Sequence, residues 1–269
     1  MKPETQSLGA VLSLAAALIF STSAQAALVV PAGNPLVVND TDLNVTWTQD
    51  ANLFKTMAAT NTNLINDVLA AAPHLTISGV STPVTYDTPN AYDTPADSGH
   101  YNLTAGDFNT GTGQMNWWGA QAWVNYLNST SYAGQTGWRL PTTNPAVSGY
   151  NQTGSELGHL FYTELGGTAG SSIVTVHANT ANYNLFSNIQ SYVYWSGTEY
   201  APNPDLAWDI STITGYQSGG LKDLQFYGWA VRPGQVSAVP VPGAVWLMGS
   251  ALVGLLGLLR RRAGTLVIG

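Results

Sequence analysis

The sequence predicts an α+β domain with two main helices and a mainly antiparallel sheet. Two segments carry apolar residues at helical spacing, and a series of short β-rich pieces separated by Gly, Asn and Pro follows them. Helices and strands that come in blocks, rather than in alternation, favour α+β over a parallel α/β fold. Residues 27–238 are enough for one domain with a substantial core, and no charged or low-complexity linker divides them.

The first predicted elements are a strand, a short helix and a long insertion. Leu43, Val45 and Trp47 alternate after a polar turn, as in a half-buried strand. Residues 64–72 are a helix candidate. Residues 73–113 are rich in Thr, Asp, Pro and Gly and repeat Tyr-Asp-Thr-Pro, so we expect an irregular, loop-rich insertion.

The first main helix is predicted at 116–127. Trp118, Ala122 and Tyr126 recur there at helical spacing, and neighbouring apolar residues broaden the face. We therefore expect an amphipathic helix. A short extended segment, stopped by a proline, is expected to follow at 137–142.

The second main helix is predicted ahead of Leu165. Thr153 and Glu156 have the spacing of a capping box, and Gly166 has the place of a C-terminal cap. Short strands are then expected at 173–176, 192–195, 207–210 and 228–232.

The first 26 residues have the features of a cleaved secretory signal peptide. Lys2 precedes an apolar run from Leu8 to Phe20, and small residues at 24 and 26 suit signal peptidase, which places the mature start at Ala27. The alternative is a buried N-terminal helix, which the lack of an amphipathic polar face disfavours.

Residues 239–262 predict a membrane-spanning tail. Residues 243–259 carry no charge and, at 1.5 Å per residue, reach about 26 Å, close to the thickness of a hydrocarbon core. The arginines that follow act as a stop-transfer signal, so 263–269 would be a cytoplasmic extension and the bulk of the chain would lie outside. A buried core helix is the alternative, which three adjacent arginines disfavour. The motif consists of Pro240, Val241, Pro242, Arg260, Arg261 and Arg262.

This pattern resembles the PEP-CTERM sorting tail, with Val241 where the family name implies glutamate. The resemblance implies processing by exosortase in an exopolysaccharide-producing Gram-negative bacterium. Transient retention in the inner membrane by the C-terminal helix would then precede delivery to the outer cell surface or extracellular matrix.

The exported part is strongly acidic. Without the two ends, four cations remain against fourteen acids, a net charge near −10. Nucleic-acid binding depends on clusters of Lys and Arg, so nucleic acid is excluded as a partner, and polyanionic polymers are disfavoured for the same reason. The absence of cysteine excludes a disulfide framework, a thiolate nucleophile and cysteine-ligated metals.

The histidines and acids predict no catalytic set, no metal site and no cofactor. Glu156 and His159 have the Glu-x-x-His spacing of di-metal bundles, but those sites need two copies, so an ordinary helix-surface pair is favoured. Calcium is the more credible ion, because export favours it and acids interleave with Asn and Thr, although solvated loop acids are favoured over a structural calcium site. The acids concerned are Asp40 with Asp42, Asp87 with Asp93, and Asp205 with Asp209.

The aromatic residues divide into an expected core and an expected contact surface. Most tryptophans bury their area, whereas aromatic rings in loops can stack on sugars. Arg139 should bury its stem and pair with a carboxylate such as Glu156 or Asp209. The structural set is Trp118, Trp138, Arg139, Leu140, Pro141, Tyr194, Trp195, Trp208, Trp229 and Arg232, and the contact set is Trp117, Tyr86, Tyr92, Tyr200 and Tyr216.

The motifs Gly137-Trp-Arg-Leu-Pro-Thr, Tyr194-Trp-Ser-Gly-Thr, Ala207-Trp-Asp and Trp229-Ala-Val-Arg-Pro, in this order, resemble the Lcl C-terminal domain family over about residues 39–234. The resemblance implies a C-type-lectin-like, sulfatase-modifying-factor-like fold and roles in surface adhesion, with no catalytic set to transfer. The formylglycine-generating relatives of that fold need active-site cysteines, which this chain lacks.

We therefore expect a non-enzymatic, exported surface protein that binds a neutral glycan or a surface protein. The alternative is a hydrolase that acts on envelope polysaccharide or another envelope polymer. A deep cleft with converging ionisable groups would favour the enzyme, and a shallow aromatic surface would favour the binding protein.

Overall fold

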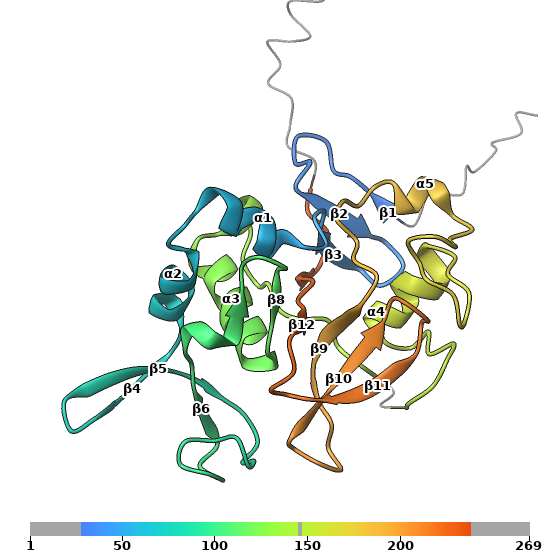
Figure 1. The fold of residues 1–269 in the computed structure, drawn as a ribbon. Helices are drawn as coiled ribbons and strands as arrows, with labels where there is room; N and C mark the ends of the chain where they lie inside the picture. Colours follow the sequence, from blue (N-terminus) through green and yellow to red (C-terminus); the bar gives the residue numbers. More distant parts are fainter. Residues whose placement is uncertain (1–27, 145–146, 238–269) are drawn as a thin grey trace, which may run out of the picture.

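The computed structural model describes residues 28–144 and 147–237 (Figure 1). The predicted signal peptide, its cleavage point and the predicted sorting tail lie outside the described residues. Within the described ranges, no helix has the length and apolar character needed to cross a membrane.

Three sheets form the framework, and almost all of their strand pairs are antiparallel. The strand orders are β1-β2-β3-β13, β11-β10-β9-β12-β8-β7 and β4-β5-β6, and β12 with β9 is the parallel pair among them. The strands are Leu28–Val29 (β1), Val37–Asp40 (β2), Val45–Thr48 (β3), His74–Ile77 (β4), Val80–Tyr86 (β5), His100–Asn102 (β6), Phe108–Asn109 (β7), Gln114–Met115 (β8), Val193–Glu199 (β9), Leu206–Ser211 (β10), Gln217–Leu221 (β11), Phe226–Tyr227 (β12) and Val231–Pro233 (β13). The predicted α+β class with mainly antiparallel sheets is confirmed.

The helices are short apart from one. They are Leu53–Thr60 (α1), Leu64–Ala71 (α2), Trp117–Ser129 (α3), Glu156–His159 (α4) and Thr180–Tyr183 (α5), with 3-10 turns at Ala105–Asp107 (η1) and Tyr132–Gly134 (η2) and a π-helix at Leu160–Glu164 (η3). Helices α1, α2 and α3 lie together on one side of the strands, and α4 and α5 lie on the other (Figure 1).

Helix α3 confirms the first predicted helix. It begins after Asn116, whose side chain accepts a hydrogen bond from the backbone N–H of Gly119. Trp118 and Ala122 are fully buried, as their spacing predicts. The predicted helix at 64–72 is also present, as α2.

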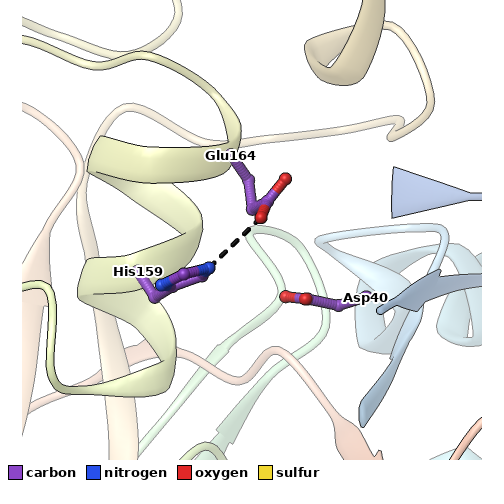
Figure 2. A group of neighbouring side chains, drawn as sticks. All are labelled: Asp40, His159 and Glu164. Carbon is purple, nitrogen blue, oxygen red and sulfur yellow. Dashed lines mark hydrogen bonds and ion pairs between the residues drawn. The ribbon is translucent and has the colours of Figure 1, made fainter. Parts of the chain in front are cut away.

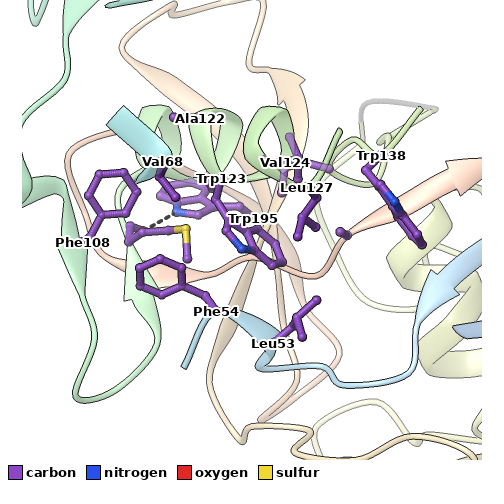
Figure 3. Packing of buried hydrophobic residues seen from close by; sticks show 14 of the residues in the cluster. Leu53, Phe54, Val68, Phe108, Ala122, Trp123, Val124, Leu127, Trp138 and Trp195 are labelled. Atoms are coloured by element: carbon purple, nitrogen blue, oxygen red, sulfur yellow. Dashed lines mark hydrogen bonds between the residues drawn. The ribbon is translucent and has the colours of Figure 1, made fainter. Parts of the chain in front are cut away.

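Two hydrophobic clusters form the core. The first lies beneath α3, where Trp123 and Trp195 pack close to Phe54 and Phe108 (Figure 3). The second gathers around Trp47, Tyr194, Tyr227 and Trp229, together with apolar residues of α4 and the π-helix. The N- and C-terminal parts of the domain share the first sheet, because β13 pairs antiparallel with β3.

Two sequence-based expectations were wrong, and one helix was missed. Residues 73–113 are not an irregular loop, because they contain the complete sheet β4-β5-β6 as well as η1 and β7. The expected strand at 173–176 is a turn in which Ile173 is nevertheless fully buried. Helix α1 was not predicted, although Leu53, Phe54, Met57 and Ala58 have helical spacing and pack against the first cluster.

The second main helix starts and winds differently from the prediction. Its N-cap is Ser155, not Thr153, and the Ser155 hydroxyl accepts a hydrogen bond from the Gly158 N–H at 3.0 Å. After one α-helical turn the chain continues as a π-helix. Gly166 ends this segment with φ +69°, a left-handed conformation that glycine adopts without strain.

Candidate functional site

Asp40, His159 and Glu164 form a buried cluster in which each residue comes from a different element (Figure 2). Asp40 is the last residue of β2, His159 is the last residue of α4, and Glu164 is the last residue of the π-helix. One ligand atom from each side chain lies within 4.8 Å of the other two. The histidine Nε2 is 3.2 Å from Glu164 Oε1.

The π-helix is what brings His159 and Glu164 together. In an α-helix, residues five apart point about 140° away from each other, because each residue turns by about 100°. A π-turn instead closes a hydrogen bond over five residues, as the bond from the Leu165 N–H to the Leu160 carbonyl does at 2.9 Å. Residues at i and i+5 then lie on nearly the same face of the helix. This local unwinding brings together two of the three cluster residues, His159 and Glu164.

Burial makes the cluster electrostatically costly. Asp40 is 0% exposed and Glu164 is 2% exposed. Burial raises the pKa of the Asp40 carboxyl, against hydrogen bonds from its turn that lower it. Burial also raises the pKa of Glu164, and the neighbouring charge of Asp40 raises it further.

Each carboxylate is held by donors outside the cluster. Asp40 Oδ1 accepts the backbone N–H groups of Asp42 at 3.2 Å and Leu43 at 3.0 Å, which is how an aspartate at the start of a turn fixes its own side chain. Glu164 Oε2 accepts a hydrogen bond from Asn182 Nδ2 at 3.2 Å. The second oxygen of each carboxylate, Asp40 Oδ2 and Glu164 Oε1, faces the cluster. Asp40 Oδ2 also accepts a long hydrogen bond of 3.4 Å from Trp47 Nε1–H.

The predicted pairing of Glu156 with His159 is wrong. Glu156 turns to Arg139, whose guanidinium donates two hydrogen bonds of 2.7 Å to the two carboxylate oxygens. The expected ion pair of Arg139 with a carboxylate is thereby confirmed, although the Arg139 side chain is 35% exposed and therefore less buried than expected. His159 faces Glu164 instead, because the π-turn redirects the following residues.

A second candidate site is an open groove of about 400 Å³ at the end of β9. The turn between β9 and β10 supplies Tyr200, and the insertion supplies Thr88. The ring of Tyr200 rests on Trp208, with ring centres 5.0 Å apart. The residues lining this groove, the Tyr200 groove below, are Thr88, Gly197, Glu199, Tyr200, Ala201 and Pro204.

A buried lysine anchors one wall of the Tyr200 groove. Lys222 is fully buried, and its Nζ lies 2.7 Å from Asp87 Oδ2 and 3.3 Å from Glu199 Oε2. The ammonium also lies 4.5 Å from the ring centre of Trp117, in a cation–π contact. Glu199 Oε1 accepts the Thr88 N–H at 3.2 Å, so the insertion and the central sheet are joined beside the groove.

The predicted contact residues do not form one surface. Trp117 was wrongly placed on it, because the residue is 3% exposed and its Nε1 donates to the Ser196 carbonyl at 2.8 Å. Tyr92 is half-buried against Trp118. Tyr86 and Tyr216 are exposed, and Tyr200 lines the groove.

The predicted structural set is largely buried. The side chains of Trp118, Trp138, Leu140, Tyr194, Trp195, Trp208 and Trp229 are 2% exposed or less. Pro141 is buried, and its carbonyl accepts the Ser196 hydroxyl at 2.8 Å. Arg232 donates from Nε to the Thr136 carbonyl at 3.0 Å.

The predicted calcium acids take separate roles. Asp42 donates its backbone N–H to Asp40, and Asp87 and Asp93 are both linked to Asn90. Asp205 and Asp209 do not share partners: the first accepts the Ala91 N–H, and the second is buried with the Ser218 hydroxyl as its donor. Burial raises the pKa of Asp209 to about 7.

Fold and sites together define a tryptophan-rich α+β domain with antiparallel sheets, an aromatic groove and a buried histidine–carboxylate cluster. The model of the Lcl C-terminal domain family matches residues 36–232, more than half of the chain, and the protein belongs to this family. Neither the curated proteins nor the solved structures contain a match to the chain.

Proposed function

We propose that the protein is a non-enzymatic binding protein of the cell surface or extracellular matrix, and that its Tyr200 groove binds a neutral glycan. The observation that carries this proposal is the position of an aromatic ring in the wall of an open groove that also holds polar side chains. Aromatic faces bury large apolar areas, and sugar rings offer apolar C–H faces to them. The C-type-lectin-like arrangement that the family resemblance implies is part of this proposal.

Charge and polar groups favour a neutral ligand. The exported part carries a net charge near −10, which repels polyanions and leaves ring stacking unaffected. Glu199 and Thr88 offer oxygen acceptors and a hydroxyl group at the groove, which suit the hydroxyl groups of a sugar. The Lys222 network holds Glu199 in place, so the polar wall is organised before a ligand arrives.

The groove is less suited to hydrolysis. Most glycosidases need two carboxyl groups on either side of the scissile bond. Among the described residues that line the groove, Glu199 is the one acidic side chain, and both of its oxygens already accept hydrogen bonds, from Thr88 and Lys222. This supports binding over the alternative hydrolase.

The first prediction tests ring stacking in the Tyr200 groove. Tyr200→Leu should lower the affinity for a neutral oligosaccharide by about 1–2 kcal/mol, since the flat aromatic face is lost, whereas Tyr200→Phe should keep most of it. Titration calorimetry with oligosaccharides selected on a glycan array would measure both variants.

Tyr216→Leu is the matched control for this experiment, because Tyr216 is an exposed tyrosine of the β10–β11 turn and lies outside the groove lining. Equal affinity of all variants would contradict the assignment of the groove. A salt-sensitive preference for sulfated or phosphorylated polymers would contradict the neutral ligand, and turnover of any polymer would favour the hydrolase.

A further inference from the structure

We propose that Asp40, His159 and Glu164 bind one divalent transition-metal ion, for which Zn²⁺ is the best-suited probe. The argument is independent of the Tyr200 groove. It rests on the convergence of one imidazole nitrogen and two carboxylate oxygens within 4.8 Å of one another, in a buried position and from three separate elements (Figure 2).

The ligand set selects the class of ion. Zn²⁺ accepts mixed nitrogen and oxygen ligands at about 2.0–2.2 Å, and sites with three protein ligands leave room for water. Ca²⁺ takes six to eight oxygen ligands and does not use imidazole. A set of one histidine and two carboxylates therefore favours zinc, or a related ion such as Mn²⁺, over calcium.

The contacts around the three side chains have the arrangement that metal ligands require. In metal sites, a ligating carboxylate is typically held by a hydrogen bond on the oxygen that does not bind the ion. Asp40 Oδ1 is held by the turn backbone, and Glu164 Oε2 is held by Asn182. Of the second oxygens, Glu164 Oε1 lies 3.2 Å from His159 Nε2, and Asp40 Oδ2 accepts a long hydrogen bond of 3.4 Å from Trp47 Nε1–H. Both carboxylates are therefore oriented before an ion binds.

The negative charge of the two buried carboxylates also favours a bound cation. Asp40 and Glu164 are buried, and Asp42 adds a further acid beside them, with His159 as the basic group at the centre. In the described part of the chain, the ion pairs of Arg and Lys lie elsewhere, between Arg139 and Glu156 and between Lys222 and its two acids. A divalent ion would offset the two buried carboxylates, which a single imidazolium does not.

The ion would be structural. It would join β2 in the first sheet to the π-helix and α4, which pack against the second hydrophobic cluster. The carboxylates are closed off from solvent, while the His159 side chain, at 15% exposed, provides the access from outside. Stabilisation by the ion follows mass action, so the melting temperature should rise with the free Zn²⁺ concentration.

The test uses the full-length chain, stripped of metal with a chelator and dialysed. Titration calorimetry with Zn²⁺ should show one ion per chain, and Zn²⁺ should raise the melting temperature. His159→Gln should weaken Zn²⁺ binding by about 100-fold or more, since a ligand is lost, and Asn182→Ala should weaken it by about 10–100-fold through the orientation of Glu164.

His74→Gln is the matched control, because His74 is an exposed histidine on β4. Substitution with Co²⁺ should give visible absorption bands in the wild type and in this control, and these bands should be absent in His159→Gln. Circular dichroism of each variant without metal separates loss of binding from loss of folding.

Three outcomes would overturn the proposal. The first is a folded wild-type chain that binds neither Zn²⁺ nor Mn²⁺. The second is equal Zn²⁺ affinity in the wild type and in folded His159→Gln. The third is binding of Ca²⁺ in preference to Zn²⁺ at this cluster. Failure of glycan binding leaves this proposal intact, because the two sites are tested with different ligands and different variants.

Discussion

At the scale of single residues, Lys222 is a buried charge that joins separate parts of the structure. Its ammonium is fully buried, contacts Asp87 and Glu199 and lies over the Trp117 ring. A buried charge that loses its partner destabilises a protein strongly, by about 3–5 kcal/mol. This lysine connects the insertion to the central sheet and fixes one wall of the Tyr200 groove.

The second prediction concerns this buried ion pair. Lys222→Met should lower the free energy of unfolding by about 3–5 kcal/mol, because Asp87, itself buried, is left without its cation. The double variant Lys222→Met/Asp87→Asn should be more stable than the single variant, since the unpaired charge is removed. Urea unfolding measures both. A double variant that is as unstable as the sum of its single changes would show that the two residues do not interact.

The third prediction concerns the buried Asp209. Its pKa is raised to about 7 by burial, whereas an aspartate in an unfolded chain has a pKa of about 3.9. Between these pH values the folded state holds a proton that the unfolded state has released, so this residue lowers stability as the pH rises from about 4 to about 7, with no further loss above.

Asp209→Asn removes that titration. Relative to the wild type, the variant should gain stability across the same pH window, by on the order of 1–4 kcal/mol at pH 8. Unfolding curves at a series of pH values measure the difference. Asp97→Asn is the control, because Asp97 is exposed. Parallel pH profiles for the wild type and Asp209→Asn would contradict the assignment.

At the scale of elements, the α4 and π-helix segment depends on how it ends. Gly166 has φ +69°, and a Cβ at this position would lie 2.9 Å from the Ala178 Cβ and 2.9 Å from the Asn179 backbone nitrogen. These contacts lie against backbone, which cannot move aside easily. The left-handed backbone and this close approach therefore leave no room for a side chain where the π-helix ends.

The fourth prediction compares two glycines. Gly166→Ala should destabilise the domain by about 1–3 kcal/mol more than Gly170→Ala. Both positions have a left-handed backbone, but a Cβ on Gly170, at φ +82°, meets nothing within 4 Å. The backbone cost is therefore shared, and thermal unfolding isolates the steric contact. Equal destabilisation would show that residues 177–179 move to make room.

At the scale of the whole molecule, the first and last strands of the described domain, β1 and β13, belong to the same sheet and form its two edges. β13 pairs with β3, and the Val236 N–H donates to the Asn39 side chain at 3.0 Å. The C-terminal strand is thus paired within the domain before the described residues end at 237. Both predicted processing sites lie outside the described residues.

The fifth prediction concerns processing. If the ends act as a signal peptide and a sorting tail, material secreted by an exosortase-containing host should begin at Ala27 and lack residues 243–259. Mass spectrometry of both termini measures this. Recovery of intact 243–259 in a permanently membrane-anchored form would refute the sorting tail.

Much of the local structure followed from the sequence. The spacing of Trp118, Ala122 and Tyr126 predicts a helix with one buried face, and α3 has such a face. The tryptophans assigned to the core are buried, because large apolar rings lower the free energy most when they leave water. Arg139 was expected to meet a carboxylate, since a half-buried guanidinium needs one, and Glu156 is its partner.

Tertiary structure decided the sites. Periodicity tells which side of an element is buried, but it does not tell which polar group another segment brings there. Asp40 and Glu164 lie close together because β2 packs near a π-turn, and neither hydrophobic periodicity nor capping residues predict a π-turn. Lys222 pairs with Asp87 only because the insertion at 73–113, which has no apolar periodicity, folds back as the β4-β5-β6 sheet. Each of these contacts is long-range and polar, so its partner is chosen by the packing of the whole domain.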